Sequence, residues 1–228
     1  MEKETMGWVI NPEEYWLSRG KRYLHEFSKR SFSEKQYVQK QEQILIKFLK
    51  TLNFESVLDV GCGFGRITKL ILEHFHGAKI QAIDLSPDQI KYAHKYVNDP
   101  RASFFIGRIQ DVAVPEGKYD LVVAVAVLMH IPFEEVGIVL KKMVKASRKH
   151  VINVDWYMAP GAVSGGYCFA HDYASLYKDA GAQFDKMIPI PRKPVYGVSF
   201  GLDSGFRIFK KKEEMQCLWH ATRKKVLQ

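Results

Sequence analysis

The feature that most constrains this chain is an apolar run at residues 57–60 that leads directly into three closely spaced glycines, Gly61, Gly63 and Gly65. An amphipathic segment, residues 67–73, follows the glycines. This order predicts a buried strand, a tight turn and a helix. Because glycine has no Cβ, the backbone can turn sharply there and approach a ligand closely. The first turn of the helix adds unpaired N–H groups. We therefore expect a ligand to lie at this turn.

A carboxylate ends the next predicted strand. Residues 79–84 finish in Asp84, roughly 20 residues beyond the glycine turn, where an acidic side chain can accept hydrogen bonds from both ribose hydroxyls of an adenosine. Ser86 then fits a helix N-cap, with Pro87 at the first helical position. The turn and Asp84 together predict a nucleoside site. The competing interpretation is an ordinary strand–helix turn that happens to be rich in glycine.

Residues 57–66 (VLDVGCGFGR) and 82–90 (AIDLSPDQI) resemble the first two motifs of class I S-adenosylmethionine-dependent methyltransferases. The resemblance covers roughly residues 55–210. It implies S-adenosylmethionine as methyl donor and S-adenosylhomocysteine as product. In that family the glycine turn holds the methionine part and the acidic residue holds the ribose. A nicotinamide oxidoreductase is disfavoured, because Arg66 stands where the Gly-x-Gly-x-x-Gly fingerprint needs its last glycine.

The resemblance also extends to single positions. In the family, the loop after the third strand borders the adenine ring, and its usual Gly-Asp-Ala reads Gly-Arg-Ile here, at 107–109. Gln110, Asp111 or the backbone must then accept from the exocyclic amine. The candidate cofactor-binding residues are Arg19, Asp59, Gly61, Cys62, Gly63, Gly65, Asp84, Leu85, Gln89, Ile109, Gln110, Ala124 and Val125. Arg19 is expected to pair with the carboxylate of the methionine moiety, since a guanidinium fork suits a carboxylate. Its alternative is a surface arginine beside core aromatic side chains.

The expected fold is α/β: a Rossmann-like doubly wound sheet, mostly parallel, with one antiparallel strand near the C-terminus, and a helical N-terminal cap. We divide the chain into a helical cap or lid at 1–52, an S-adenosylmethionine-binding methyltransferase domain at 53–212 and a C-terminal tail at 213–228. Residues 119–127 are almost continuously apolar, which predicts a central strand buried on both faces.

Two helices are expected in the cap, at 12–30 and 33–52, the first capped by Asn11. At the other end of the sheet, we expect strands at 183–190 and 206–210 to form the antiparallel pair that closes such sheets.

A sulfonium methyl group is already activated, so its transfer needs mainly alignment with a nucleophile, which can be worth roughly 7–11 kcal/mol. A general base adds roughly 10²–10⁴-fold where the acceptor carries a proton. The candidate catalytic residues are His130, His171, Asp155 and Tyr157. The resemblance implies a place for His130 near the methyl-transfer site. The alternatives are loop bracing for His130 and a helix start, with Asp172 as N-cap, for His171.

Aromatic side chains are dense in the segments expected above the ligand-bearing edge of the sheet. The candidate substrate-binding residues are Trp16, Tyr23, Trp156, Tyr167 and Phe169. Such a lining suits a small, partly apolar acceptor, or a cationic amine held by cation–π contacts. The alternative is that these rings pack the core of the cap.

The composition leaves several function classes open. The net charge of +9 favours RNA, an acidic small molecule or an anionic surface, or simply reflects a solvated basic surface. The three cysteines make neither a disulfide framework nor a metal-ligand spacing, so we expect a cytoplasmic, metal-independent protein. No apolar run reaches the ~18 residues of a membrane span, and residues 1–10 have no signal-peptide core, so no membrane partner is expected.

The function expected from the sequence is in-line methyl transfer to an oxygen or nitrogen of a small molecule. Two alternatives remain: an RNA or protein methyltransferase, for which nucleic acid is the less favoured partner, and a non-catalytic methyltransferase-like binding or scaffold domain. The oligomeric state, the acceptor and the methylated atom are left open.

Overall fold

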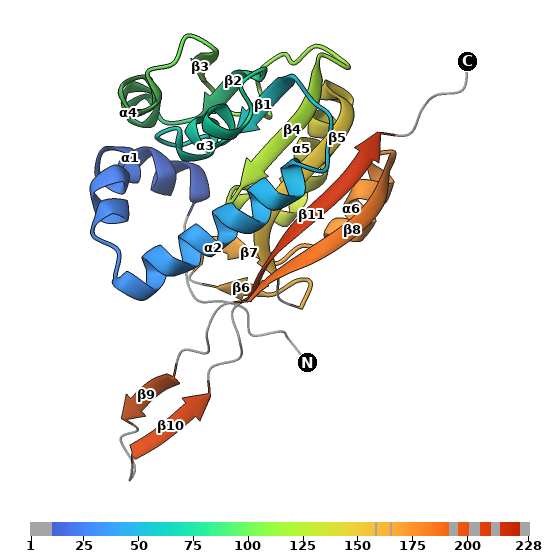
Figure 1. Cartoon of the computed structure of the whole chain (residues 1–228). Coiled ribbons are helices and arrows are strands. Elements are labelled where there is room, and N and C mark those ends of the chain that lie inside the picture. Colours follow the sequence, from blue (N-terminus) through green and yellow to red (C-terminus); the bar gives the residue numbers. More distant parts are fainter. Residues whose placement is uncertain are drawn as a thin grey trace.

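The computed structural model describes residues 11–157, 159–164, 166–191, 196–200, 206–210 and 215–223. A single seven-stranded sheet forms its centre (Figure 1). From one edge to the other, its strands are β3 (Ala102–Ile106), β2 (Lys79–Asp84), β1 (Ser56–Val60), β4 (Tyr119–Val125), β5 (Ser147–Tyr157), β11 (Met215–Arg223) and β8 (Ala182–Pro191).

Strands β1 to β5 pair in parallel, and β11 lies antiparallel between β5 and β8. This topology confirms the predicted fold class, one antiparallel strand near the C-terminus included. All seven residues of β4 are buried, as its apolar sequence predicts. Strand β1 sits between β2 and β4, so the order of the sheet reverses there. Open α/β sheets bind ligands at the carboxyl ends of the strands at such a point.

Helices cover both faces of the sheet (Figure 1). One core forms where α2 (Phe32–Leu49), α3 (Arg66–His74) and α4 (Pro87–Val97) pack on the sheet, and the other lies under α5 (Phe133–Ala146) and α6 (Tyr173–Asp179). Alternate strand residues divide between the two cores: Val57 faces the first and Leu58 the second. A short 3-10 turn, η1 (Leu128–His130), follows β4. No helix in the described ranges is long and apolar enough to span a bilayer.

Local capping signals fix where the helices begin. The side chain of Asn11 accepts hydrogen bonds from the amides of Glu13 and Glu14, and α1 (Pro12–Ser28) starts at Pro12 as expected. Ser31 and Glu34 form a reciprocal capping box at the start of α2, which ends at Leu49 instead of the expected residue 52.

The predicted pairing of 183–190 with 206–210 is wrong. Strand β8 pairs with β11, which comes from the segment interpreted as a C-terminal tail, whereas β10 (Phe206–Lys210) pairs with β9 (Tyr196–Phe200) in a separate two-stranded sheet. The polar residues Gln216 and His220 interrupt the apolar pattern of β11. Both are buried with partners: Gln216 accepts from the side chains of Tyr37 and Gln41, and His220 contacts His150. A third pair, β6 (Val163–Ser164) and β7 (Cys168–Phe169), lies in the loop after β5.

Candidate active site

The carboxylate of Asp84 ties the glycine turn to the end of β2. The Gly63 amide donates to its Oδ2 at 2.8 Å, and the Ser86 amide donates to its Oδ1 at 2.8 Å. The amides of Gly61 and Cys62 both donate to the carbonyl of Ile83, at 2.8 and 3.0 Å. The two motifs that the sequence analysis pairs are therefore joined in space.

Each predicted glycine of the turn has a positive φ: +67° at Gly61, +56° at Gly63 and +88° at Gly65. L-residues with a Cβ adopt this region at a cost of about 1–2 kcal/mol. A Cβ at Gly61 would lie 2.5 Å from Val127, and one at Gly65 would lie 2.6 Å from Val97 of α4. Gly65 does not line the cavity described next; it allows α3 and α4 to approach each other.

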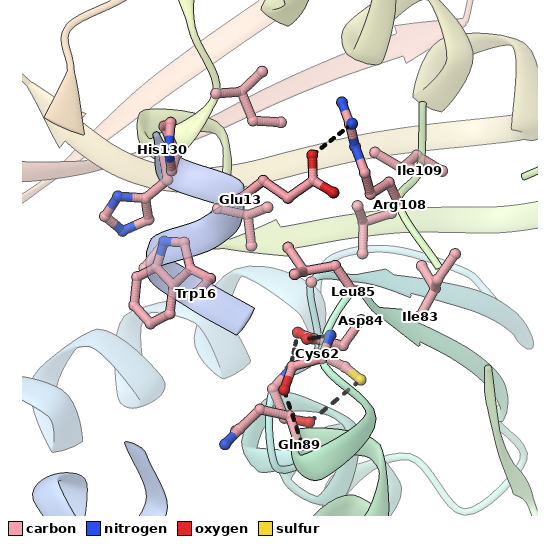
Figure 2. Close-up of a pocket in the computed structure, with 18 of the residues that line it drawn as sticks. Glu13, Trp16, Cys62, Ile83, Asp84, Leu85, Gln89, Arg108, Ile109 and His130 are labelled. Carbon is pink, nitrogen blue, oxygen red and sulfur yellow. Dashed lines mark hydrogen bonds and ion pairs between the residues drawn. The ribbon is translucent and has the colours of Figure 1, made fainter. Parts of the chain in front are cut away.

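A cavity of about 290 Å³ opens between this turn, the ends of β2 and β4, and helix α1 (Figure 2). Its walls include ten predicted cofactor-binding residues: Asp59, Gly61, Cys62, Gly63, Asp84, Leu85, Gln89, Ile109, Gln110 and Val125. Three others, Arg19, Gly65 and Ala124, lie outside its lining. The volume is near the lower end of the range for small-ligand sites. We call this space the first cavity.

Asp59 lies at the floor of the first cavity, 1% exposed, where its Oδ2 accepts from the Thr68 hydroxyl at 2.6 Å. Burial raises the pKa of Asp59 to about 7, and burial also raises the pKa of Asp84. The hydrogen bond from Thr68 opposes the shift at Asp59, and the amides of Ser86 and Gly63 oppose it at Asp84.

An ion pair crosses the first cavity. Glu13, in the first turn of α1, lies 2.7 Å from Arg108 (Figure 2). Arg108 also pairs with Glu135 of α5 at 3.0 Å. Gln110 donates to the same Glu135 carboxylate at 2.8 Å. No sequence pattern predicts Glu13, Arg108 and Glu135 as site residues. The only signal was the arginine at 108, where the resembling family carries an aspartate.

A second cavity of about 260 Å³ adjoins the first. The two share five lining residues: Trp16, Tyr23, Arg66, Ala126 and His130. Trp156 and Tyr167 also line the second cavity, so four of the five predicted substrate-binding residues come together here. Phe169 does not: it is 5% exposed and packs against Phe133 and His171.

Arg19 lies in the second cavity instead of the first. Its Nε pairs with Glu26 at 2.6 Å, and its guanidinium carbon lies 5.3–5.4 Å from the ring centroids of Tyr15, Trp16 and Tyr23. The carboxylate that Arg19 binds in this structure is therefore supplied by its own helix.

His130 borders both cavities. Its Nδ1 lies 3.0 Å from the Tyr167 carbonyl oxygen, and its ring packs against Trp16 at a centroid distance of 4.9 Å. Because a carbonyl oxygen can only accept, Nδ1 is assigned the hydrogen and Nε2 keeps its lone pair. Burial lowers the pKa of His130 to about 4, so the ring is neutral at neutral pH.

The other three candidate catalytic residues do not line either cavity. Asp155 is fully buried: its Oδ1 accepts from the amides of Val127 and Met129, its Oδ2 accepts from the side chain of Asn153, and burial raises its pKa to about 6. His171 contacts the Leu128 carbonyl at 3.0 Å, and burial lowers its pKa. Asp155 and His171 thus brace the loop that carries His130. Tyr157 is 44% exposed.

Ala126 is a site residue that sequence analysis missed. It lines both cavities directly after β4 with φ of +57°, and its amide donates to the Val154 carbonyl at 2.7 Å. Strained backbone of this kind gathers at ligand sites. Nothing in the apolar run that contains this alanine signals the conformation.

Comparison with known proteins assigns a family to the segment that supplies most of the lining of the first cavity. Residues 57–150 match the family model described as a methyltransferase domain. Residues 57–150 are therefore assigned to the methyltransferase-domain family. The matched segment supplies Asp59, the glycine turn, Asp84 and the loop that carries Arg108.

Relatives of the methyltransferase domain differ in what they act on. Malonyl-acyl-carrier-protein O-methyltransferase of Acetivibrio thermocellus is 32% identical over 125 residues, which cover 53% of this chain and 43% of that protein. The chain thus spans less than half the length of this relative. Magnesium protoporphyrin IX methyltransferase from Synechocystis, solved with S-adenosylmethionine, superposes with a TM-score of 0.68 at 16% identity, covering 96% of this chain and all of that one.

A second similar structure was solved with S-adenosylhomocysteine and 1,6-didemethyltoxoflavin bound. This 1,6-didemethyltoxoflavin-N1-methyltransferase from Burkholderia thailandensis superposes with a TM-score of 0.66 at 16% identity, covering 99% of this chain and 98% of that one. At these identities the two superpositions establish the fold of the methyltransferase domain and its surroundings.

The second cavity is built mostly from outside the matched methyltransferase domain. Trp16, Tyr23, Trp156 and Tyr167 all lie beyond residues 57–150. In the described part of the chain, no group of three or more His, Cys, Asp or Glu residues is arranged to hold a metal ion.

Proposed function

We propose that this protein transfers a methyl group from S-adenosylmethionine to an oxygen or nitrogen atom of a small molecule, without a metal ion. The observation that carries the proposal is the first cavity, where the glycine turn and Asp84 of the matched methyltransferase domain meet. When bound, S-adenosylmethionine supplies a sulfonium-activated methyl group for in-line displacement.

The residues of the first cavity fit this cofactor. Each oxygen of Asp84 accepts one backbone amide, and a carboxylate oxygen has a second acceptor site, so both remain able to accept from ribose hydroxyls. Leu85 and Ile109 provide apolar walls for an adenine ring. A Cβ at Gly63 would meet only the end of the Gln89 side chain, at 3.4 Å, so the turn is open on the cavity side.

The start of α3 suits the carboxylate of the methionine moiety. Its N-cap, Gly65, offers no side-chain cap, and the first turn has no acidic residue. Arg66 and Ile67 of that turn line the first cavity. Uncapped amides at a helix N-terminus favour a negatively charged group.

We assign His130 the role of general base. It lies where the two cavities meet, with Nε2 as the free acceptor of its ring. His130 Nε2 takes the proton that the acceptor loses as its oxygen or nitrogen bonds to the methyl carbon, while the electron pair of the broken carbon–sulfur bond stays on sulfur. Asp155 is a positioning residue, because it holds the amides of Val127 and Met129 beside His130.

Relatives support a small acceptor. Their names are malonyl-acyl-carrier-protein O-methyltransferase, ajmaline N-methyltransferase and trans-aconitate 2-methyltransferase. The second cavity, at about 260 Å³, has the size of a site for one or two rings and adjoins the first, as an acceptor site must.

The test uses S-adenosylmethionine with a deuterated methyl group. The protein is incubated with this cofactor and, in parallel, with metabolite, RNA and protein fractions of a cell extract. Mass spectrometry is expected to find a small molecule that gains the labelled methyl group. Label only in RNA or protein would contradict the proposed acceptor class, and no label in any fraction, with S-adenosylhomocysteine still bound, would indicate a non-catalytic binding domain.

A further inference from the structure

We infer that the acceptor is a planar aromatic acid, whose ring lies in the second cavity and whose anionic group pairs with Arg30. The inference rests on the proposed function, because it concerns the site that adjoins the proposed cofactor cavity.

Aromatic side chains from separate parts of the chain form the walls of the second cavity. Trp16 and Tyr23 come from α1, Trp156 from the end of β5 and Tyr167 from the loop that follows. The rings also brace one another: Trp16 meets Tyr23 edge to face at 5.4 Å, and Tyr15 stacks on Tyr167 at 4.4 Å. Rigid aromatic walls of this kind suit a flat ring, which stacks on one face or meets an edge.

The same cavity carries an excess of positive charge among its described side chains. Arg19, Arg30 and Arg66 line it, against one carboxylate, Glu34. Arg19 is paired with Glu26 at 2.6 Å, and Arg66 with Glu42 at 2.7 Å.

Arg30 differs from the other two arginines. In the described part of the chain it has no carboxylate within ion-pair distance, and its guanidinium lies 4.1 Å from the centroid of the Phe27 ring. Stacking on an aromatic face leaves the edge of the guanidinium fork available for a bidentate anion. The guanidinium of Arg30 also disfavours the cationic amine that an aromatic lining could otherwise hold.

The residues that line the two cavities indicate where the nucleophilic atom and the anionic group of the acceptor lie. The nucleophilic atom must lie at the junction with the first cavity, where His130 and Ala126 line both spaces. Figure 2 shows His130 and Trp16 on the side of the first cavity away from Arg108. Because His130 presents an acceptor there, the nucleophile is a hydroxyl or ring N–H, and the anionic group is a separate substituent that reaches Arg30.

The test compares acids with neutral molecules of the same shape. The probes are the ortho, meta and para hydroxybenzoates and the matching hydroxybenzamides, titrated by ligand-observed NMR into protein saturated with S-adenosylhomocysteine. At least one acid is expected to bind about tenfold more tightly than its amide. Arg30→Gln is expected to abolish that preference and Arg30→Lys to retain part of it. The matched control is Lys29→Gln, which removes an exposed charge next to Arg30 and outside both cavities.

The outcomes distinguish a failure of the proposed function from a failure of this inference. If S-adenosylhomocysteine fails to bind, the proposed function fails. If S-adenosylhomocysteine binds, and Arg30→Gln binds it with the affinity of the wild type, the variant is folded. The preference for acids over amides then decides the inference. No acid that binds more tightly than its amide, or a preference that survives in Arg30→Gln, would overturn the inference.

Discussion

Glu13 and Arg108 lie 95 residues apart in the chain, yet Glu13 accepts a hydrogen bond from the Arg108 guanidinium at 2.7 Å across the first cavity. The pair connects the first turn of α1 to the loop after β3. Helix α1 thus closes one side of the proposed cofactor site through a contact that is partly exposed: the side chains of Arg108 and Glu13 are 29% and 42% accessible.

Replacing Glu13 tests whether this ion pair retains the cofactor. Exposed ion pairs contribute little to folding, so Glu13→Gln is expected to lower the free energy of unfolding by at most about 0.5 kcal/mol. Release of S-adenosylhomocysteine in stopped-flow fluorescence is expected to be roughly two- to fivefold faster. The matched control is Glu14→Gln, because Glu14 is exposed in the same helical turn and has no ion pair in the described part of the chain. Equal release rates in the two variants would show that the pair does not hold the site closed.

Gly65 and Gly77 provide a test of the helix packing behind the glycine turn. Gly65→Ala is expected to lower the free energy of unfolding by about 2–4 kcal/mol, because the new Cβ would lie 2.6 Å from Val97 at φ of +88°. Gly77→Ala is expected to change it by less than about 0.5 kcal/mol, since among the described residues no atom beyond its chain neighbours lies within 4 Å of its Cβ position. Urea denaturation of both variants measures the difference. A Gly65 variant as stable as the Gly77 variant would mean that α3 and α4 have room to separate.

Asp155→Asn tests the support of the His130 loop. Asp155 accepts hydrogen bonds from Val127, Met129 and Asn153. The NH₂ group of the new asparagine side chain would therefore face a hydrogen-bond donor instead of an acceptor. The expected loss in free energy of unfolding is roughly 1–3 kcal/mol.

The pH dependence of that loss has a definite sign. Burial raises the pKa of Asp155 to about 6, above its unfolded value of about 3.9, so the folded state binds the proton more tightly. The stability contributed by this titration is complete below about pH 4 and is lost as the pH rises through 6. Urea titrations from pH 4 to pH 7 should therefore show the advantage of the wild type over Asp155→Asn shrinking. A constant difference would contradict the assignment, and Asp179→Asn, at an exposed aspartate that ends α6, serves as control.

Local signals made the first cavity predictable from the sequence. The strand at 57–60, the glycines after it and Asp84 at the end of the next strand each follow from short-range rules, and the topology of a parallel sheet then brings them together. The N-caps Asn11, Ser31 and Ser86 also act within three residues of the amides that they bind.

Features that depend on partners far away in the sequence could not be predicted. Strand β11 carries Gln216 and His220, whose partners lie on other elements. Its sequence therefore lacks the apolar pattern that predicts a buried strand. The left-handed conformation of Ala126 depends on the neighbouring strand and loop, which the residue itself does not reveal. Arg19 is predicted to bind a cofactor carboxylate, whereas its partner in the structure is Glu26, two helical turns away, which the sequence does not distinguish from any other surface glutamate.

Calorimetric titration of S-adenosylhomocysteine tests the central claim, that the turn at 61–65 and the carboxylate of Asp84 bind an adenosyl cofactor. The wild type is expected to bind one molecule per chain with a dissociation constant in the micromolar range. Asp84→Ala is expected to bind at least about tenfold more weakly, with an unchanged circular dichroism spectrum, because the ribose hydroxyls lose a charged acceptor. No binding to the wild type, or equal binding to folded Asp84→Ala, would contradict the claim.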